Sequence, residues 1–210
     1  MFGKAAAVVL LALTLSLAAQ ADAGPLRRAG LVDVRAGSPQ VRIDMRYATE
    51  RNFTGRRLPG YCEQRALLLR RPARALRRVE RALSERGLGL LVLDAYRPAR
   101  ATRAMVRWAR REGREDLLDG YIARRSRHNL GAAVDLTLVE AGSGDPLSMG
   151  TAYDSFSTRS HTRNAKGRAL ENRLRLKRAM EREGFENYRR EWWHYDFPGG
   201  KRRLDLPIGC

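Results

Sequence analysis

Two short segments, far apart in the chain, carry side chains that suit a metal site, and the fold must bring them together. Residues 126–135 read SRHNLGAAVD and residues 191–194 read EWWH. The first segment supplies His128 and Asp135, and the second supplies Glu191 and His194. Histidine nitrogens and carboxylate oxygens are ligands that zinc takes in proteins. The first constraint on the fold is therefore that these two segments meet.

The number of these groups matches a catalytic zinc site. Such a site uses three protein ligands and leaves a fourth position open for water. His128, Asp135 and His194 would hold one Zn²⁺ per chain, and Glu191 would be free to act as the base. The third histidine, His161, lies in a polar stretch, where we expect solvent exposure and not a fourth ligand.

The spacing within the two segments indicates strands and turns, not one helix. Residues 133–139 alternate and contain β-branched side chains, which predicts a buried strand from which Asp135 projects. Glu191 and His194 are three residues apart and would reach the same region if the chain turns at the start of a strand. This spacing differs from the helical HExxH signature.

Elsewhere the pattern predicts a mixture of strands and helices without regular βαβ alternation. Strands are expected at residues 41–46, 88–94, 133–139 and 192–197. Helices are expected at 73–86, 99–112 and 164–183, the last capped by Asn164, and a long polar loop at 143–160. The expected inward-facing side chains are Leu76, Val79 and Leu83 in the first helix and Leu170, Leu174 and Met180 in the last. This mixture predicts a single α+β domain with a mainly antiparallel sheet and flanking helices.

Arg97 is a candidate for a catalytic role because it follows the predicted strand 88–94 directly. The guanidinium is always charged and can stabilise the negative charge that develops in a tetrahedral transition state. A structural ion pair with Asp94 is the alternative role. We favour the catalytic one, because the ends of buried strands commonly meet at a site.

Residues 1–23 have the pattern of a secretory signal peptide. Lys4 precedes an apolar run, and Ala21-Asp22-Ala23 forms an A-x-A cleavage site. Residues 24–210 would then form the catalytic domain, periplasmic or secreted, with no stable membrane insertion after cleavage. In that setting Cys62 and Cys210 could form a disulfide, and two unpaired cysteines remain an equally good interpretation.

The net charge of +18 comes mostly from arginines spread along the whole chain. A solvated basic surface explains them, with weak attraction to anionic envelope polymers as a further consequence. The sequence contains no nucleic-acid motif and no aromatic residues interleaved with the basic ones. Nucleic acid is therefore not an expected partner.

The two segments resemble those of the zinc D-alanyl-D-alanine dipeptidases, relatives of the bacterial enzymes that confer vancomycin resistance. Residues 126–135 meet the pattern S-x-H-x-x-G-x-A-x-D, and residues 191–194 meet E-x-W-H. Similar family segments occur at residues 44–55, 94–98 and 149–154. The five segments follow the family's order and span most of residues 24–210.

This resemblance implies roles for individual residues. It implies zinc bound by His128, Asp135 and His194, with Glu191 as general base and acid and Arg97 stabilising the transition state. It also implies that Ser126 and Asp154 border the substrate, with Asp154 near the free ammonium group and Tyr47 closing that end. The implied fold is the one shared with zinc DD-carboxypeptidases and the Hedgehog signalling domain.

The resulting expectation is an exported zinc metallopeptidase whose partner is a small dipeptide, D-Ala-D-Ala, hydrolysed to two D-alanines. Two alternatives stay open. One is a zinc DD-carboxypeptidase that acts on peptidoglycan stem peptides with the same metal chemistry. The other is a non-catalytic, metal-stabilised domain that binds anionic envelope polymers through its arginines.

Overall fold

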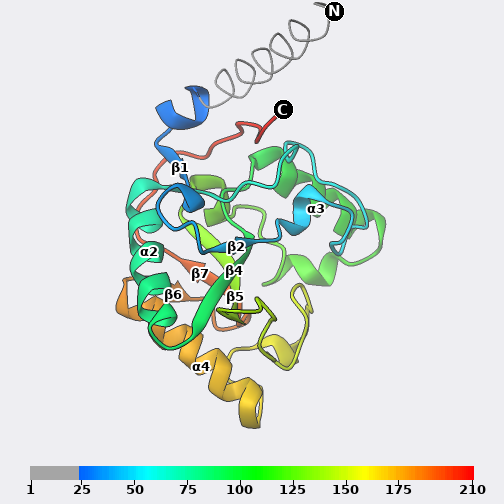
Figure 1. Ribbon diagram of the computed structural model, residues 1–210. Coiled ribbons are helices and arrows are strands. Elements are labelled where there is room, and N and C mark those ends of the chain that lie inside the picture. Colours follow the sequence, from blue (N-terminus) through cyan, green and yellow to red (C-terminus); the bar gives the residue numbers. More distant parts are fainter. Residues whose placement is uncertain (1–23) are drawn as a thin grey trace, which may run out of the picture.

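A five-stranded sheet in the order β2-β4-β5-β7-β6 forms the centre of the computed structural model, which describes residues 24–210 (Figure 1). The strands are β2 (Arg42–Ile43), β4 (Leu88–Asp94), β5 (Ala133–Glu140), β6 (Glu186–Asn187) and β7 (His194–Asp196). Only the β2–β4 pair is parallel within this sheet. The predicted α+β class with a mainly antiparallel sheet is confirmed, whereas the predicted signal peptide at 1–23 lies outside the described residues.

The two central strands, β4 and β5, occupy the segments that their apolar sequences predicted. All but one residue of each strand is buried. Such runs are stable only where both faces of a sheet are covered. The outer predicted strands at 41–46 and 192–197 are shorter than expected, because only β2 and β7 within them join the ladder. Trp192, for example, donates its backbone N–H to the carbonyl of Ser160 in a loop.

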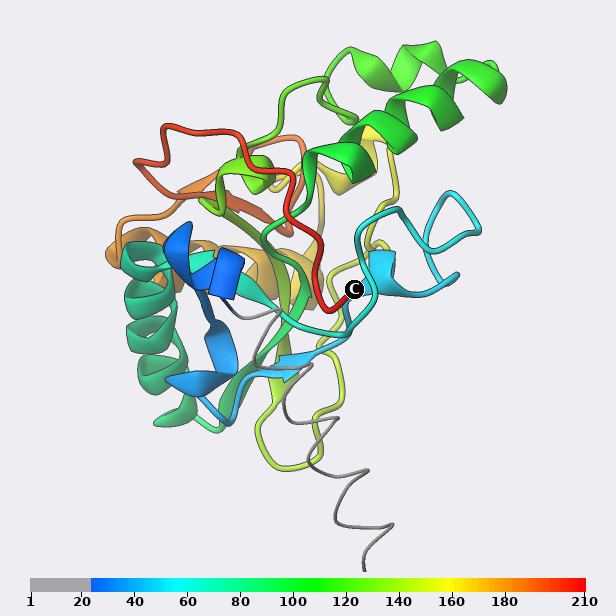
Figure 2. The same ribbon diagram turned by 90° about the horizontal axis from the view of Figure 1, so that it is seen from above.

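Helices α2 (Arg70–Ser84) and α4 (Gly167–Arg182) contact each other and pack on the sheet, whereas α3 (Ala99–Arg111) lies on the other side of the molecule (Figures 1 and 2). Leu76, Val79 and Leu83 of α2 are buried, as predicted. Among the described residues, no helix is both long enough and apolar enough to cross a membrane.

The N-terminal part of α4 differs from the prediction. The helix begins at Gly167, and the side chain of Asn164 donates instead to the carbonyl of Thr158 in the preceding loop. The buried face of the helix runs through Asn172, Leu176 and Met180, because this face packs on the sheet and on the loop that precedes the helix. Of the three predicted inward residues in this helix only Met180 is fully buried, whereas Leu170 and Leu174 are half-buried.

Short elements connect these parts. A two-stranded antiparallel sheet pairs β1 (Leu31–Asp33) with β3 (Leu67–Leu69). The 3-10 helices are η1 (Val34–Ala36), η2 (Arg46–Ala48), η3 (Glu115–Leu118), η4 (Arg127–Leu130) and η5 (Thr158–Ser160). Of these, η2 and η4 carry residues of the predicted site.

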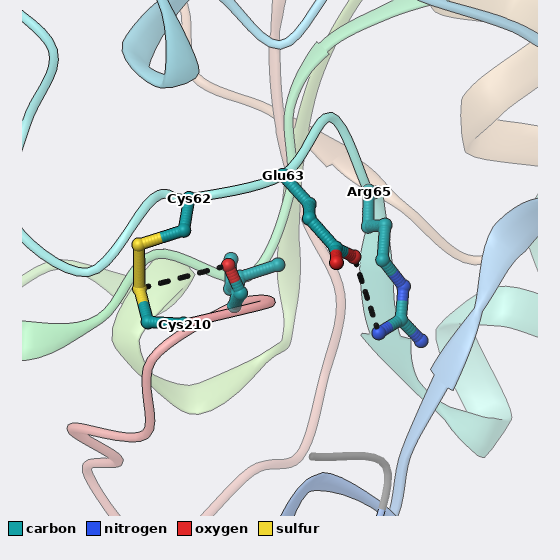
Figure 3. Close-up of a disulfide and its surroundings, with 5 residues drawn as sticks. Cys62, Glu63, Arg65 and Cys210 are labelled. Carbon is teal, nitrogen blue, oxygen red and sulfur yellow. Dashed lines mark hydrogen bonds and ion pairs between the residues drawn. A yellow bond between two sulfur atoms is a disulfide. The ribbon is translucent and has the colours of Figure 1, made fainter. Parts of the chain in front are cut away.

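The C-terminal segment returns to the body of the domain and is fixed there by a disulfide between Cys62 and Cys210 (Figure 3). On its way, the backbone N–H of Leu204 bonds to Asn129 and that of Ile208 bonds to Gly60, each at 2.8 Å. The disulfide joins residues 148 positions apart. Cross-linking so long a loop restricts the unfolded chain strongly. Of the two interpretations of the cysteines, the structure contains the paired one.

Candidate metal centre and active site

The register of the sheet places three acidic or histidine side chains in one row. Asp94 at the end of β4 pairs with Asp135 of β5, and Asp135 pairs with His194 of β7. Directly paired residues of antiparallel strands project from the same face of a sheet. The sheet therefore brings Asp94, Asp135 and His194 together on one of its faces.

His128 reaches this row from the turn that precedes β5. The hydroxyl of Ser126 accepts a hydrogen bond from the backbone N–H of His128 at 3.3 Å and caps η4. The helix ends at Gly131, which has φ 65°. Glycine suits this left-handed backbone conformation, and a Cβ atom here would approach the side chain of the buried Leu31 to 2.6 Å and displace it.

Both histidines present a free ring nitrogen to the carboxylate of Asp135. His128 Nδ1 lies 2.6 Å from the carbonyl oxygen of Ala95, and His194 Nε2 lies 3.1 Å from Asp196 Oδ1. We assign the ring hydrogens to these contacts, because each has an acceptor. The lone pairs are then on His128 Nε2 and His194 Nδ1, which lie 3.2 and 2.9 Å from Asp135 Oδ1.

These three atoms fit a metal ion. His128, Asp135 and His194 each offer one ligand atom, and these atoms lie within 4.8 Å of one another. Three electron-rich atoms that face one another repel unless a cation or protons lie between them. Two imidazoles and one carboxylate, each imidazole held by a hydrogen bond on its other nitrogen, are the donor set of a catalytic zinc site. Within residues 24–210 this is the one such group.

Glu191 lies beside this group, in the turn that leads into β7. The backbone N–H of His194 bonds to its carbonyl, so the two side chains face the same space, with Glu191 Oε2 4.0 Å from His194 Nδ1. The side chain is buried, and burial raises the pKa of Glu191 to about 8. The carboxyl group is thus placed to take up and release a proton next to the three ligand atoms.

Arg97 is held by the neighbouring carboxylate of Asp94. Its Nε and Nη2 donate to Asp94 Oδ2 at 2.9 and 2.7 Å, and Tyr61 donates to Asp94 Oδ1 at 2.5 Å. Burial lowers the pKa of Arg97, but Asp94 and the neighbouring tyrosines together outweigh burial, so the pKa lies well above its usual value and the guanidinium stays charged. Nη2 also lies 3.8 Å from Asp135 Oδ2. Arg97 therefore forms the ion pair with Asp94 and also faces the site.

The opposite end of the site is built from loops. Tyr47 of η2 lies 3.1 Å from both carboxylate oxygens of Asp154 and donates its hydroxyl hydrogen to them. Asp154 has φ 58°, a left-handed conformation that aspartate tolerates better than most residues. Burial raises the pKa of Asp154 well above its usual value, and the charges of Asp135 and Glu191 add to the effect. A cation placed here would reverse that destabilisation.

All eight predicted site residues line one cavity of about 310 Å³. This volume is at the small end of the range for ligand sites. Aromatic side chains, among them Phe53, Tyr121 and Phe156, complete its walls. His161, predicted to be outside the site, lies 3.3 Å from the hydroxyl of Tyr121 and does not belong to the ligand group. The ligand group and the Tyr47–Asp154 pair therefore line two parts of one small cavity.

Sequence reasoning missed several residues that support the site. Asp196 and Tyr61 hold His194 and Asp94, and Tyr153 donates to Asp135. Two of them could have been suspected, since Asp196 follows His194 by one strand repeat and Tyr153 adjoins Asp154. Nothing in the local sequence around Tyr61 indicates its contact with Asp94, because the two residues belong to different elements.

The family model and the curated relatives that this chain resembles are all described as D-Ala-D-Ala dipeptidases. Residues 27–208 match a family model described as D-ala-D-ala dipeptidase. A D-alanyl-D-alanine dipeptidase of Enterococcus faecalis is 39% identical over 74% of this chain and 85% of its own length. One from Enterococcus faecium is 35% identical over 80% of this chain and 93% of its own length. A solved structure of a vancomycin resistance D,D-pentapeptidase variant in complex with Zn(II) is 18% identical, with a TM-score of 0.42, over 64% of this chain and 74% of that one.

Proposed function

The chain belongs to the D-Ala-D-Ala dipeptidase family of zinc peptidases, and we propose that it is an exported enzyme that hydrolyses D-alanyl-D-alanine to two D-alanines. One observation carries this proposal above all. Three zinc-type ligand atoms and the carboxyl group of Glu191 meet in a small cavity that a second, half-buried carboxylate, that of Asp154, also lines. A free dipeptide has a scissile carbonyl for the first group and an ammonium group for the second carboxylate.

Different residues of the chain have different roles in the proposed reaction. A zinc ion held by His128, Asp135 and His194 would activate a water molecule and polarise the scissile carbonyl. Glu191 takes the proton from the attacking water and delivers it to the leaving amine, which general acid–base catalysis requires of one group in both directions.

Arg97 stabilises the negative charge that grows on the carbonyl oxygen. Its guanidinium is fixed in advance by Asp94, so little reorganisation is needed when that charge appears. Donors of this kind typically contribute about 3 kcal/mol to lowering the barrier.

The part of the cavity that holds Asp154, which we assign to the substrate's amine, favours a dipeptide over a peptidoglycan stem peptide. In a stem peptide the nitrogen of the penultimate residue is an amide with a long chain attached. Tyr47 and Asp154 are hydrogen-bonded to each other in the same cavity, and the half-buried carboxylate of Asp154, whose charge Asp135 and Glu191 destabilise, favours a cation there. Both features support the dipeptidase over the carboxypeptidase alternative, and the acid–base and guanidinium groups support an enzyme over a polymer-binding domain.

Hydrolysis assays with the purified zinc-loaded protein test the proposal. We expect release of D-alanine from D-Ala-D-Ala and loss of this activity on chelation. Glu191→Gln should lower kcat at least about 1,000-fold, as loss of a central catalytic group does, while zinc content stays unchanged. Glu186→Gln, at an exposed glutamate of β6, is the matched control. An unchanged rate in Glu191→Gln would refute the mechanism, and faster cleavage of a stem pentapeptide than of the dipeptide would favour the carboxypeptidase.

Export has separate support. The pattern of residues 1–23 is that of a signal peptide, and the Cys62–Cys210 disulfide suits an oxidising compartment. Cell fractionation followed by N-terminal sequencing should find the protein outside the cytoplasm, beginning at Gly24. A cytoplasmic protein that retains residues 1–23 would contradict this part of the proposal.

A further inference from the structure

Tyr153 lies between the two ends of the cavity and touches both. Its hydroxyl donates to Asp135 Oδ2 at 2.9 Å, and its oxygen lies 3.1 Å from the hydroxyl oxygen of Tyr47. Tyr47 in turn donates to Asp154. A short series of contacts thus runs from a ligand of the proposed metal site to the carboxylate at the amine end.

The two oxygens of Asp135 have different surroundings. Oδ1 faces both free histidine nitrogens, at 2.9 and 3.2 Å. Oδ2 faces away from them, accepts from Tyr153, and lies 3.8 Å from Arg97 Nη2. Tyr153 therefore fixes the rotation of the carboxylate, so that one oxygen is presented to the metal and the other is not.

Each tyrosine hydroxyl has one hydrogen and can therefore donate only one hydrogen bond. Carboxylates are stronger acceptors than phenols, so Tyr153 donates to Asp135 and Tyr47 donates to Asp154. The two phenol oxygens are then 3.1 Å apart with no hydrogen between them, so this contact does not hold Tyr153 in place. Tyr153 is held by an edge-on contact of its ring with Trp193, at a centroid distance of 5.4 Å. If the carboxylate of Asp135 rotates, the hydroxyl of Tyr153 therefore cannot easily move with it.

We propose that Tyr153 is a positioning residue for the metal ligand Asp135, and that it keeps this carboxylate from turning toward Arg97. Without the hydroxyl, the nearest charged donor to Oδ2 is Arg97 Nη2. Rotation toward it would draw Oδ1 away from the two histidines and would weaken the metal site. This inference rests on the proposed metal site and is independent of which peptide is cleaved.

Zinc affinity, measured by competition with a chromogenic chelator, tests the proposal. Tyr153→Phe removes only the hydroxyl and should weaken zinc binding about 10-fold or more, as loss of a hydrogen bond to a metal ligand typically does. Tyr47→Phe should bind zinc as the unmodified protein does, because its hydroxyl bonds to Asp154 and not to a ligand.

Tyr195→Phe is the matched control for the loss of a buried phenol. Tyr195 is fully buried, its hydroxyl has no hydrogen-bond partner among the described residues, and it projects from the face of β7 opposite His194. Thermal unfolding of the metal-free proteins checks that all three variants fold.

The outcomes separate the two proposals. Activity of Tyr153→Phe should recover when zinc is in excess, which a damaged fold would not allow. Equal zinc affinity in Tyr153→Phe and Tyr195→Phe would overturn the positioning role while leaving the dipeptidase proposal intact. A failure of the unmodified protein to bind zinc would overturn the proposed function itself.

Discussion

The two ends of the cavity are built in different ways. At the metal end, Asp94, Asp135 and His194 lie in one row of hydrogen-bonded strands. At the amine end, Tyr47, Tyr153 and Asp154 come from η2 and from the long segment after β5, outside the strands of the sheet. Strand register fixes side chains more precisely than loop packing does. On the proposed function, the sheet and the turns next to its strands determine the chemistry, whereas the loops around Tyr47 and Asp154 determine which molecule is admitted.

This division can be tested by changing one end at a time. A substitution at the metal end should lower kcat, because its groups act on the transition state. A substitution at the amine end should raise KM, because its groups hold the substrate equally before and during the reaction. A substitution in the helical layer, which we define as α2 and α4, should change stability and leave kcat and KM unchanged.

After Glu191→Gln, the largest of these effects is expected for Arg97→Lys at the metal end. A lysine cannot form the paired contacts with Asp94, so its charge is no longer fixed toward the carbonyl oxygen. We expect kcat to fall about 100- to 1,000-fold with a small change in KM. Steady-state kinetics would measure it. A rise in KM with unchanged kcat would place Arg97 in substrate binding instead.

An intermediate effect is expected for Asp154→Asn at the amine end. Asparagine tolerates the left-handed backbone of this position, so the loop should keep its shape. Loss of the charge should raise KM for D-Ala-D-Ala about 10- to 100-fold, the range for a hydrogen bond to a charged group, with kcat little changed.

The N-acetylated dipeptide, which lacks the ammonium group, provides the comparison. The variant should discriminate less between the free and the acetylated dipeptide than the unmodified enzyme does. An unchanged ratio of kcat/KM for the two substrates would show that Asp154 does not meet the ammonium group.

The smallest effect is expected for Glu80→Gln in α2, away from both ends. Burial raises the pKa of Glu80 from 4.5 to about 6, and its Oε2 has no hydrogen-bond partner among the described residues. Since the folded protein holds this proton more tightly than the unfolded chain, the stabilisation is complete below pH 4.5. It is lost as the pH rises through about 6.

Replacing the acid should therefore stabilise the protein at pH 8 by about 1 kcal/mol and leave stability unchanged at pH 4. Urea unfolding at both pH values, with kinetics at pH 8, would measure this. Equal stability of the two proteins at pH 8 would show that the buried charge costs nothing. A change in kcat would contradict the separation of the helical layer from the site.

Much of the metal end could be predicted because its signals are local. The glycine after η4, the apolar run of β5 and the turn before β7 each lie within a few residues of a ligand. The helical stripe of α2 was likewise readable from its own sequence. Where a local signal competed with another contact, the prediction failed, as for Asn164, whose side chain bonds to the loop at Thr158 and does not cap α4.

The sequence by itself determined the candidate ligand and base residues, the central strands and the family, because each depends on residue identity at short spacing. Only the tertiary structure decided that Cys62 and Cys210 pair, that Asp94 holds Arg97, and that Tyr153 connects Asp135 with the amine end. Those contacts join residues from separate elements. Their distances follow from how the sheet, the loops and the C-terminal segment pack together, and short-range sequence patterns contain no record of that packing.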